Sequence, residues 1–530
     1  MRNAVLLLLA ASFAACNTDP SKPAYWVDRL TSRSVQQRVD ACRHLRLMKD
    51  AADGEKIVPL AKDEDPRVRQ AAAEALGELG IKDAVPALDD AIDFSVGGGT
   101  DRETRAINEA NGAIVQALGA LGDPRAVPSV LKLLRSRDHF VKLAAVEALG
   151  QLRAPAAVEP LMAIATDENV EPFIAKKAVI ALGRIADPRA VPAIEKMLFM
   201  ERKGVSFYPE ASFAVFEVGE PAVSPLLTLL AGKDPAMEKW AQDNSILPEA
   251  VYAKTAEVLG DVGDPRAEPI LLEKLKYESP SDYKLLVRAK AAQALGRMRD
   301  AKAAKAVAAL LPEPEGNVRD MYGQALVLIG SPEVLPELEK ACAVGSWDAR
   351  ESSMHALSNL GTEKEIAFLQ KLVSDEPARW MKECADDGNE AAACKTALDK
   401  HLKILEGHLA RLEAVKACGK SVDCWIGKLK DPQGPVRERA AFELGRLGDP
   451  KAISPLLAAL KDDDLDARFA ENTAIGWLVS GSAAGKAQAK AAVNRLDQIL
   501  TDEEGKLYYI KIDEDLKRLA AKLEKLARAS

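Results

Sequence analysis

One segment constrains the fold more than any other feature, because versions of it recur along most of the chain. Residues 118–134 read LGALGDPRAVPSVLKLL. Gly122 can adopt the left-handed conformation that ends a helix, Asp123-Pro124 favours a tight turn, and Pro128 is tolerated in the first turn of a helix. The segment therefore predicts the end of one helix, a minimal turn and the start of a second helix.

The predicted helices have an apolar stripe at the i, i+3, i+4, i+7 spacing, so each must pack against neighbours. Positions equivalent to Leu118 serve as repeat anchors and are Cys42, Leu76, Leu118, Leu149, Leu182, Val215, Leu259, Leu295, Leu326, Leu357, Leu444 and Ile475. Neighbouring anchors lie 31 to 44 residues apart, except for one gap of 87 residues that conceals degenerate copies. A two-helix unit with a period near 31 residues predicts an all-α fold, an α-solenoid.

The repeat Ala-Leu-Gly-x-Leu-Gly-Asp-Pro-x-Ala-Val-Pro, with Val-Arg pairs at 68–69, 287–288, 318–319 and 436–437, resembles the HEAT-repeat family. It looks most like the short subtype named after phycocyanobilin lyases. The resemblance implies stacked two-helix HEAT repeats over 25–480. The arginines of these pairs are expected to bind acids such as Asp65 and Asp431 at the inter-repeat turns. A fold resemblance does not carry a function with it.

The first residues resemble an export signal. Residues 1–15 have one positive charge, a short apolar core and small residues, and they predict a lipoprotein signal peptide. Phe13-Ala14-Ala15-Cys16 resembles the bacterial lipobox, which implies lipidation of Cys16 and a cell-envelope location, on the periplasmic face of a membrane or at the cell surface. The alternative is an ordinary cleaved signal. Residues 16–24 are expected to form a polar tether.

Charge and composition exclude some partners. The formal net charge is −8, so the overall positive field of a nucleic-acid-binding protein is absent. No later apolar run is long enough to span a membrane, so membrane contact is expected through the lipid anchor only.

Connections between repeats are longer at 93–105, 199–212, 232–250, 277–284 and 374–400. Several contain aromatic residues that are candidates for a binding surface, namely Phe207, Tyr208, Trp240, Tyr277, Tyr283 and Trp380. The alternative is that these rings only fold each insertion onto its own repeat. After Ile475 the period fails, and residues 481–530 are expected to form a helical C-terminal cap with an apolar stripe that includes Leu516 and Leu523.

Four cysteines gather in the most degenerate region, 374–430. In an exported chain such clustering favours disulfides over zinc, and we predict the pairs Cys384–Cys394 and Cys418–Cys424. Cys42 and Cys342 lie many repeats apart and are expected to be small buried residues.

No catalytic, cofactor or metal site is evident in the sequence. Gly481–Ala487 resembles a phosphate loop only superficially, because it is one residue short and follows a helix. Adjacent His-Glu pairs, by which iron-binding HEAT-repeat hydroxylases are recognised, are absent. We therefore expect an envelope-tethered scaffold that binds a protein or an extended peptide, without enzymatic activity. The alternative is an enzyme, or an enzyme accessory, of the lyase-type HEAT group.

Overall fold

The computed structural model describes residues 19–95, 97–481, 483–488, 492–493, 495–496 and 510–529. These residues are mainly helical, and their two short strands form one antiparallel hairpin, in which Glu201 faces Ser206. The all-α prediction is confirmed. The chain divides into two compact units between Ala214 and Val215, and each unit is a stack of helices.

Unit 1 begins with α1, which starts at Pro23 inside the predicted 16–24 tether. Its α-helices and strands are α1 (Pro23–Val27), α2 (Val35–Met48), α3 (Ala51–Gly54), α4 (Pro66–Glu78), α5 (Val85–Asp90), α6 (Arg102–Leu121), α7 (Val127–Leu133), α8 (His139–Gln151), α9 (Val158–Thr166), α10 (Pro172–Ile185), α11 (Val191–Met197), β1 (Glu201–Arg202), β2 (Val205–Ser206) and α12 (Tyr208–Val218), in which the division falls. Its 3-10 turns are η1 (Asp28–Thr31), η2 (Glu55–Lys62), η3 (Lys82–Ala84), η4 (Pro124–Ala126), η5 (Pro155–Ala157) and η6 (Pro188–Ala190).

Unit 2 continues the alternation of shorter and longer helices. Its α-helices are α13 (Glu220–Leu230), α14 (Pro235–Asp243), α15 (Pro248–Val262), α16 (Glu268–Lys274), α17 (Lys284–Arg297), α18 (Ala304–Ala308), α19 (Gly316–Ile329), α20 (Leu335–Ala341), α21 (Trp347–Leu360), α22 (Ile366–Asp386), α23 (Ala391–Cys418), α24 (Val422–Lys428), α25 (Gly434–Leu447), α26 (Ile453–Ala459), α27 (Leu465–Gly481), α28 (Ala483–Ala487) and α30 (Ile510–Ala529). Its 3-10 turns are η7 (Pro265–Ala267), η8 (Ala301–Ala303), η9 (Pro332–Val334), η10 (Glu363–Glu365) and η11 (Pro450–Ala452).

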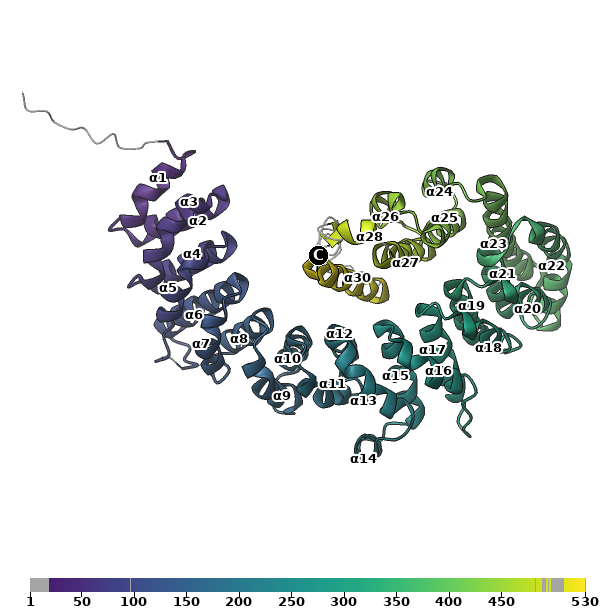
Figure 1. The fold of residues 1–530 in the computed structure, drawn as a ribbon, viewed down its shortest axis with the longest axis horizontal. Coiled ribbons are helices and arrows are strands. Elements are labelled where there is room, and N and C mark those ends of the chain that lie inside the picture. The colour runs from purple at the N-terminus through teal and green to yellow at the C-terminus, as the bar shows by residue number, and fades with distance from the viewer. Residues whose placement is uncertain are drawn as a thin grey trace, which may run out of the picture. The chain divides into compact units, whose positions relative to one another are not determined.

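Each unit has two layers. The longer helix of each repeat packs on the longer helix of the next, as α4, α6, α8 and α10 do in unit 1 and α15, α17, α19 and α21 do in unit 2. The shorter helices form the second layer (Figure 1). All the predicted repeat anchors are buried, with side chains at most 1% exposed.

The Asp-Pro turn forms as predicted. Gly122 has φ of 70° and ends α6, and the Asp123 carboxylate then accepts a hydrogen bond of 2.9 Å from the backbone N–H of Arg125. The Arg125 guanidinium also donates to this carboxylate, and together these bonds lower the pKa of Asp123 to about 2. The turn therefore begins with a charged cap in place of the missing helical hydrogen bonds.

The glycine of the Ala-Leu-Gly motif brings neighbouring long helices close together. A Cβ atom on Gly183 would lie 2.5 Å from the Cα atom of Ala214, and one on Gly296 would lie 2.9 Å from that of Ala325. Such distances leave no room for any side chain. The motif is therefore a packing requirement at the contact between one repeat and the next.

The recurrent arginines have the predicted structural role. Arg437 pairs with the acids Asp462 and Asp463, and Arg288 pairs with Glu278, but the carboxylates of the two named acids, Asp65 and Asp431, are not their partners. Arg69 donates to the carbonyl oxygen of Asp63 at 3.0 Å, and Arg437 donates to that of Asp431 at 2.9 Å. The Asp65 carboxylate instead binds Arg67. A guanidinium reaches these carbonyls because the connection between repeats leaves them without helical partners.

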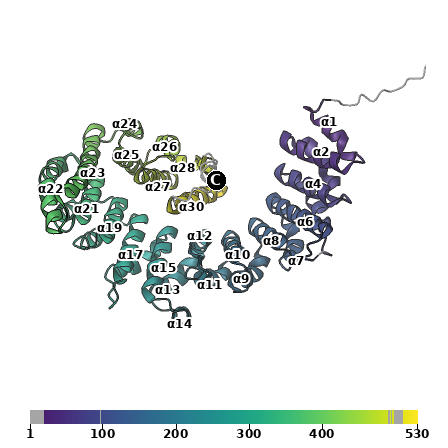
Figure 2. The same ribbon diagram turned by 180° about the vertical axis from the view of Figure 1, so that it is seen from behind.

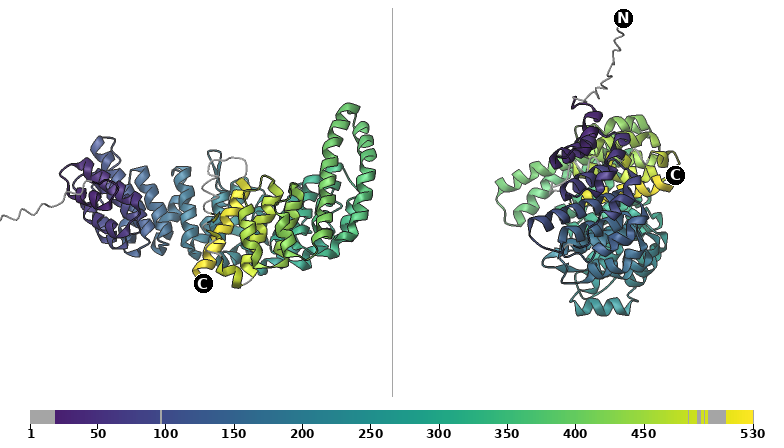
Figure 3. Two further views of the ribbon diagram at one scale, coloured as in Figure 1. Left: turned by 90° about the horizontal axis from the view of Figure 1, so that it is seen from above. Right: turned by 90° about the vertical axis from the view of Figure 1, so that its left-hand side faces the viewer.

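The longest insertion is a helical hairpin of α22 and α23, which extends beyond the neighbouring repeats of unit 2 (Figure 3). Both predicted disulfides are present: Cys384–Cys394 joins the two helices and Cys418–Cys424 joins α23 to α24, with Cα separations of 5.9 and 5.4 Å. Cys42 and Cys342 are free and buried, and burial raises the pKa of the Cys42 thiol to about 12.

The last helix, α30, has the predicted apolar stripe, because Leu516, Leu519, Ala520 and Leu523 are buried. It packs against α27 and α28, and the views of Figures 1 and 2 both show it beside α27. We call the side of unit 2 on which α30 lies the inner face. No helix among the described residues is both long enough and apolar enough to cross a membrane.

Candidate functional site

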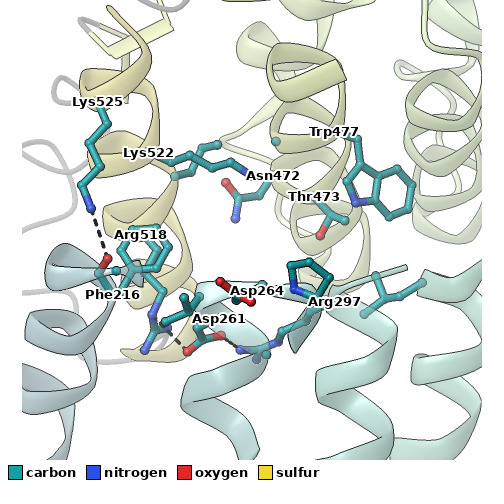
Figure 4. Close-up of a pocket in the computed structure, with 18 of the residues that line it drawn as sticks. Phe216, Asp261, Asp264, Arg297, Asn472, Thr473, Trp477, Arg518, Lys522 and Lys525 are labelled. Carbon is teal, nitrogen blue, oxygen red and sulfur yellow. Dashed lines mark hydrogen bonds and ion pairs between the residues drawn. The ribbon is translucent and has the colours of Figure 1, made fainter. Parts of the chain in front are cut away.

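A cavity of about 530 Å³ lies on the inner face of unit 2, between α30 and the long helices opposite it (Figure 4). We call it the α30 cavity. Its walls come from the ends of α12 and α15, from Arg297 of α17, from Leu328 of α19, from α27 and from α30. Repeats far apart in sequence therefore contribute to one site.

Asp261 anchors the floor of the cavity. Its side chain is 3% exposed and forms ion pairs with Arg297 and with the Nε atom of Arg518, the latter at 3.3 Å. Because both guanidinium groups bind this one carboxylate, α30 is tied to α15 and α17 by a buried ion pair. These two arginines are engaged by the protein itself.

Lys525 holds the other side of α30. Its ammonium group donates hydrogen bonds to the carbonyl oxygens of Phe216 and Glu217, at 3.1 and 2.8 Å. These carbonyls belong to the last turn of α12, where helical hydrogen bonds run out and a cation is favoured. Lys525 is thus also engaged in holding α30 in place.

Three polar side chains of the lining have no hydrogen bond or ion pair with the described residues. Asn472 is 8% exposed, and its buried Oδ1 atom has no hydrogen-bond partner. Thr473 and Lys522 likewise have no hydrogen bond or ion pair to any other residue that the structure describes. Surrounding protein lowers the pKa of Lys522, with no acid to oppose the effect. In Figure 4 the Lys522 side chain extends from α30 toward Asn472.

The apolar part of the lining is aromatic. Phe216, Phe469 and Trp477 contribute to the walls. The guanidinium of Arg299 lies 4.2 Å from the centroid of the Trp477 ring, which holds that ring in position. The cavity therefore combines a flat apolar surface with a small number of polar groups, as ligand sites do.

A second cluster of ionisable groups is buried between α21, α23 and α25, and we call it the Glu438 cluster. Glu438 pairs with His355 at 3.1 Å and with Arg411 at 2.5 Å, and it accepts a hydrogen bond of 2.9 Å from Asn359. Arg411 also donates to Nδ1 of His408 at 2.8 Å. The cluster joins the repeats on either side of the α22–α23 hairpin.

The charges in the Glu438 cluster fix its protonation. Burial alone would raise the pKa of Glu438, but the charges of Arg411 and His355 outweigh burial and lower it. Burial alone would lower the pKa of His355, but Glu438 raises it to about 9. Burial lowers the pKa of His408 to about 4. At neutral pH, His355 is therefore charged and His408 is neutral.

The predicted aromatic candidates do not form one surface. Phe207 is fully buried, so it cannot offer its ring to a partner in this conformation. Trp380 donates to the carbonyl oxygen of Cys394, and Tyr277 packs edge-on against Tyr252 with centroids 5.6 Å apart. Tyr208 and Trp240 are half-buried, and Tyr283 is 58% exposed. Most of these rings serve to pack their own insertion. Cys16 lies outside the described residues.

The repeat alignment contains a signal for the cavity that aromatic content did not give. Asp261, Arg297, Leu328 and Trp477 each stand two residues after a repeat anchor. That position therefore faces the inner side of unit 2 in four repeats.

Comparison with known proteins agrees with the repeat architecture. The family described as HEAT repeats matches residues 23–96, 108–175, 141–205, 247–321, 305–385 and 422–507. The chain belongs to the HEAT-repeat family.

Two curated HEAT-repeat relatives are enzymes. Deoxyhypusine hydroxylase of Gibberella zeae is 27% identical over 262 residues, which cover 48% of this chain and 69% of the relative. The Bos taurus enzyme of the same name is 27% identical over 270 residues, covering 47% of this chain and 86% of the relative. Kap95p, solved with RanGDP, is 12% identical with a TM-score of 0.44, covering 94% of this chain and 76% of that chain. The expectation that this chain lacks enzymatic activity is contradicted by the two hydroxylases.

The Glu438 cluster does not fit the iron centre by which hydroxylases of this fold are recognised. The chain has no adjacent His-Glu pair. His355 and His408 do lie near acids, but the cation between His408 and Glu438 is the Arg411 guanidinium. Within the described ranges, no three His, Cys, Asp or Glu side chains are grouped to hold a metal ion. The cluster is therefore assigned a role in stability.

Proposed function

We propose that this chain binds a protein segment on the inner face of unit 2, and that it acts on the bound protein as an enzyme or as the accessory of one. The observation that carries the binding half is the α30 cavity. Its volume of about 530 Å³ lies in the range of roughly 300–1,000 Å³ usual for ligand sites. Its unused polar groups are available to a ligand.

The enzymatic half rests on the relatives. Two proteins named deoxyhypusine hydroxylase share 27% identity with about half of this chain. The short repeats also resemble the phycocyanobilin-lyase type, which favours the broader class of HEAT-repeat enzymes and accessories. Neither resemblance brings with it a metal site among the described residues.

A photocrosslinking residue in place of Thr473 tests the binding surface. We expect it to form covalent adducts with a protein in extracts of the native cell, because Thr473 lies in the cavity wall. The control places the same residue at Lys305, whose side chain is 77% exposed on α18. Adducts that form equally from both positions, or only from Lys305, would place binding elsewhere.

The captured protein then tests the enzymatic half. Its intact mass is compared before and after incubation with the purified full chain and a cell extract. If the mass of the captured protein rises by one oxygen atom only when this chain is present, this chain takes part in hydroxylation, as its relatives' name implies. An unchanged mass in the presence of the chain would exclude hydroxylation of that protein.

We further propose that Cys16 carries a lipid that tethers the chain to the cell envelope. Support comes from the lipobox-like Phe13-Ala14-Ala15-Cys16 and the preceding apolar run. Cys16→Ser is expected to move the protein from the membrane fraction to the soluble or unprocessed fraction. Recovery of Cys16→Ser in the membrane fraction with normal processing would contradict the anchor.

A further inference from the structure

The polar side chains that line the α30 cavity are of two kinds: those that form ion pairs or hydrogen bonds with the protein, and those that do not. Arg297 and Arg518 share Asp261, and Lys525 caps α12. The side chains of Asn472, Thr473 and Lys522 make no hydrogen bond or ion pair within the part of the chain that the structure describes. Asn472 is buried, and a buried polar group without a partner destabilises a fold, so its Oδ1 atom has no structural benefit there. Thr473 is half-buried and Lys522 is exposed at the open side of the cavity, so both can reach a ligand.

The unused groups share one chemistry. The Lys522 ammonium is a hydrogen-bond donor only, the Thr473 hydroxyl can donate, and the Asn472 amide offers two donors and an acceptor. Glu220, Asp261 and Asp264 also line the cavity, but Glu220 and Asp264 bind Arg266, and Asp261 binds the two arginines. Among the described residues, Lys522 is therefore the cation of the lining without a counterion, and the ligand that suits it is an anion.

The single positive charge of Lys522 favours a carboxylate over a phosphate as the ligand. Phosphate groups are usually bound by several cations or by the two-pronged guanidinium of arginine. Here both arginines of the lining are engaged with Asp261, and one ammonium is left. A single carboxylate matches one ammonium and two neutral donors, the Thr473 hydroxyl and the Asn472 amide N–H. The buried Oδ1 atom of Asn472 is an acceptor, and a backbone N–H of the segment that carries the carboxylate would satisfy it. The aromatic walls from Phe469 and Trp477 add an apolar surface beside it.

We infer that the α30 cavity is a carboxylate site, in which Lys522, Asn472 and Thr473 bind an aspartate or glutamate side chain of an extended protein segment. Trp477 and Phe469 contact the apolar residue next to that acid. The source of the carboxylate rests on the protein binding proposed above. The carboxylate chemistry itself rests on the cavity alone.

Calorimetry with the purified full chain tests the site. The probe is a capped tetrapeptide, Gly-Glu-Phe-Gly, and its matched control has glutamine in place of the glutamate. We expect the glutamate peptide to bind roughly tenfold more tightly, as a charge-assisted hydrogen bond predicts. Lys522→Gln should abolish this preference, whereas Lys517→Gln, on the same helix but outside the lining of the cavity, should retain it.

Asn472→Leu separates a role in binding from a role in folding. The buried Oδ1 atom of Asn472 has no hydrogen-bond partner among the described residues, so the midpoint of thermal unfolding should be unchanged or raised. Affinity for the glutamate peptide should fall several-fold, on the order of one lost hydrogen bond. A lowered midpoint with unchanged affinity would make Asn472 a structural residue and would overturn its assignment.

Equal affinities for the glutamate and glutamine peptides would overturn the carboxylate site, and so would equal binding of inorganic phosphate and the glutamate peptide. A different result would contradict the proposed protein binding. If the glutamate peptide binds as expected but crosslinking at Thr473 captures no protein, the cavity is a carboxylate site and the proposed protein partner is wrong.

Discussion

Glu438→Gln should lower the free energy of unfolding by about 3–5 kcal/mol. The carboxylate pairs with His355 and Arg411, and all three side chains are largely buried. Removing its charge leaves the buried Arg411 guanidinium without this counterion and takes away the charge that keeps His355 protonated. The cost arises because a buried charge that loses its partner keeps its full desolvation penalty. Urea denaturation of the wild-type and variant chains measures the difference.

The pH dependence of this difference gives a second test. The pKa of His355 is raised to about 9, so its contribution to stability is complete below its unfolded value of about 6.5 and is lost as pH rises through 9. The gap between wild type and Glu438→Gln should shrink over that window. Glu406→Gln, at an exposed position of α23, is the matched control. A similar loss of stability in both variants would show that Glu438 has no special role.

Leu118→Ala and Leu149→Ala should each cost about 2–5 kcal/mol, because both side chains are fully buried where neighbouring long helices meet. The cost combines lost apolar burial with the cavity that remains. Lys132→Ala, on an exposed side of α7, should change stability by less than about 0.5 kcal/mol. Thermal unfolding of the three variants measures the effect. Equal shifts would contradict the alignment of the repeats on Leu118.

The repeat anchors show why so much of the fold is predictable from the sequence. Cys42, Leu118 and Ile475 are different residues in distant repeats, yet each is fully buried. In a solenoid each repeat contacts mainly its neighbours, so the contacts of one unit recur at a fixed spacing. The same reasoning extends to the turn at Asp123 and to Cys418–Cys424, where the partners are close in sequence.

The sequence predicts less well which aromatic side chains of the insertions are exposed to solvent. Phe207 lies in an insertion, where aromatic residues are candidates for binding, yet the structure buries it completely. An insertion without a repeat to guide it can fold its aromatic residues inward or outward with the same sequence pattern. Packing with the adjacent helices decides between the two, as the cation–π contact between Arg202 and Phe207 illustrates.

The sequence by itself determined the two-helix repeats, their turns, the disulfides and the apolar stripe of α30, since all of these depend on residues a few turns apart. Only the tertiary structure decided what α30 covers. Lys525 binds the Phe216 carbonyl across a separation of 309 residues, and Arg518 pairs with Asp261. The repeat alignment marks the position that faces the inner side, as at Asp261, but it does not show which helix packs there, because each contact of α30 occurs once and depends on how the intervening repeats curve. The α30 cavity and the Glu438 cluster both arise from contacts of this kind.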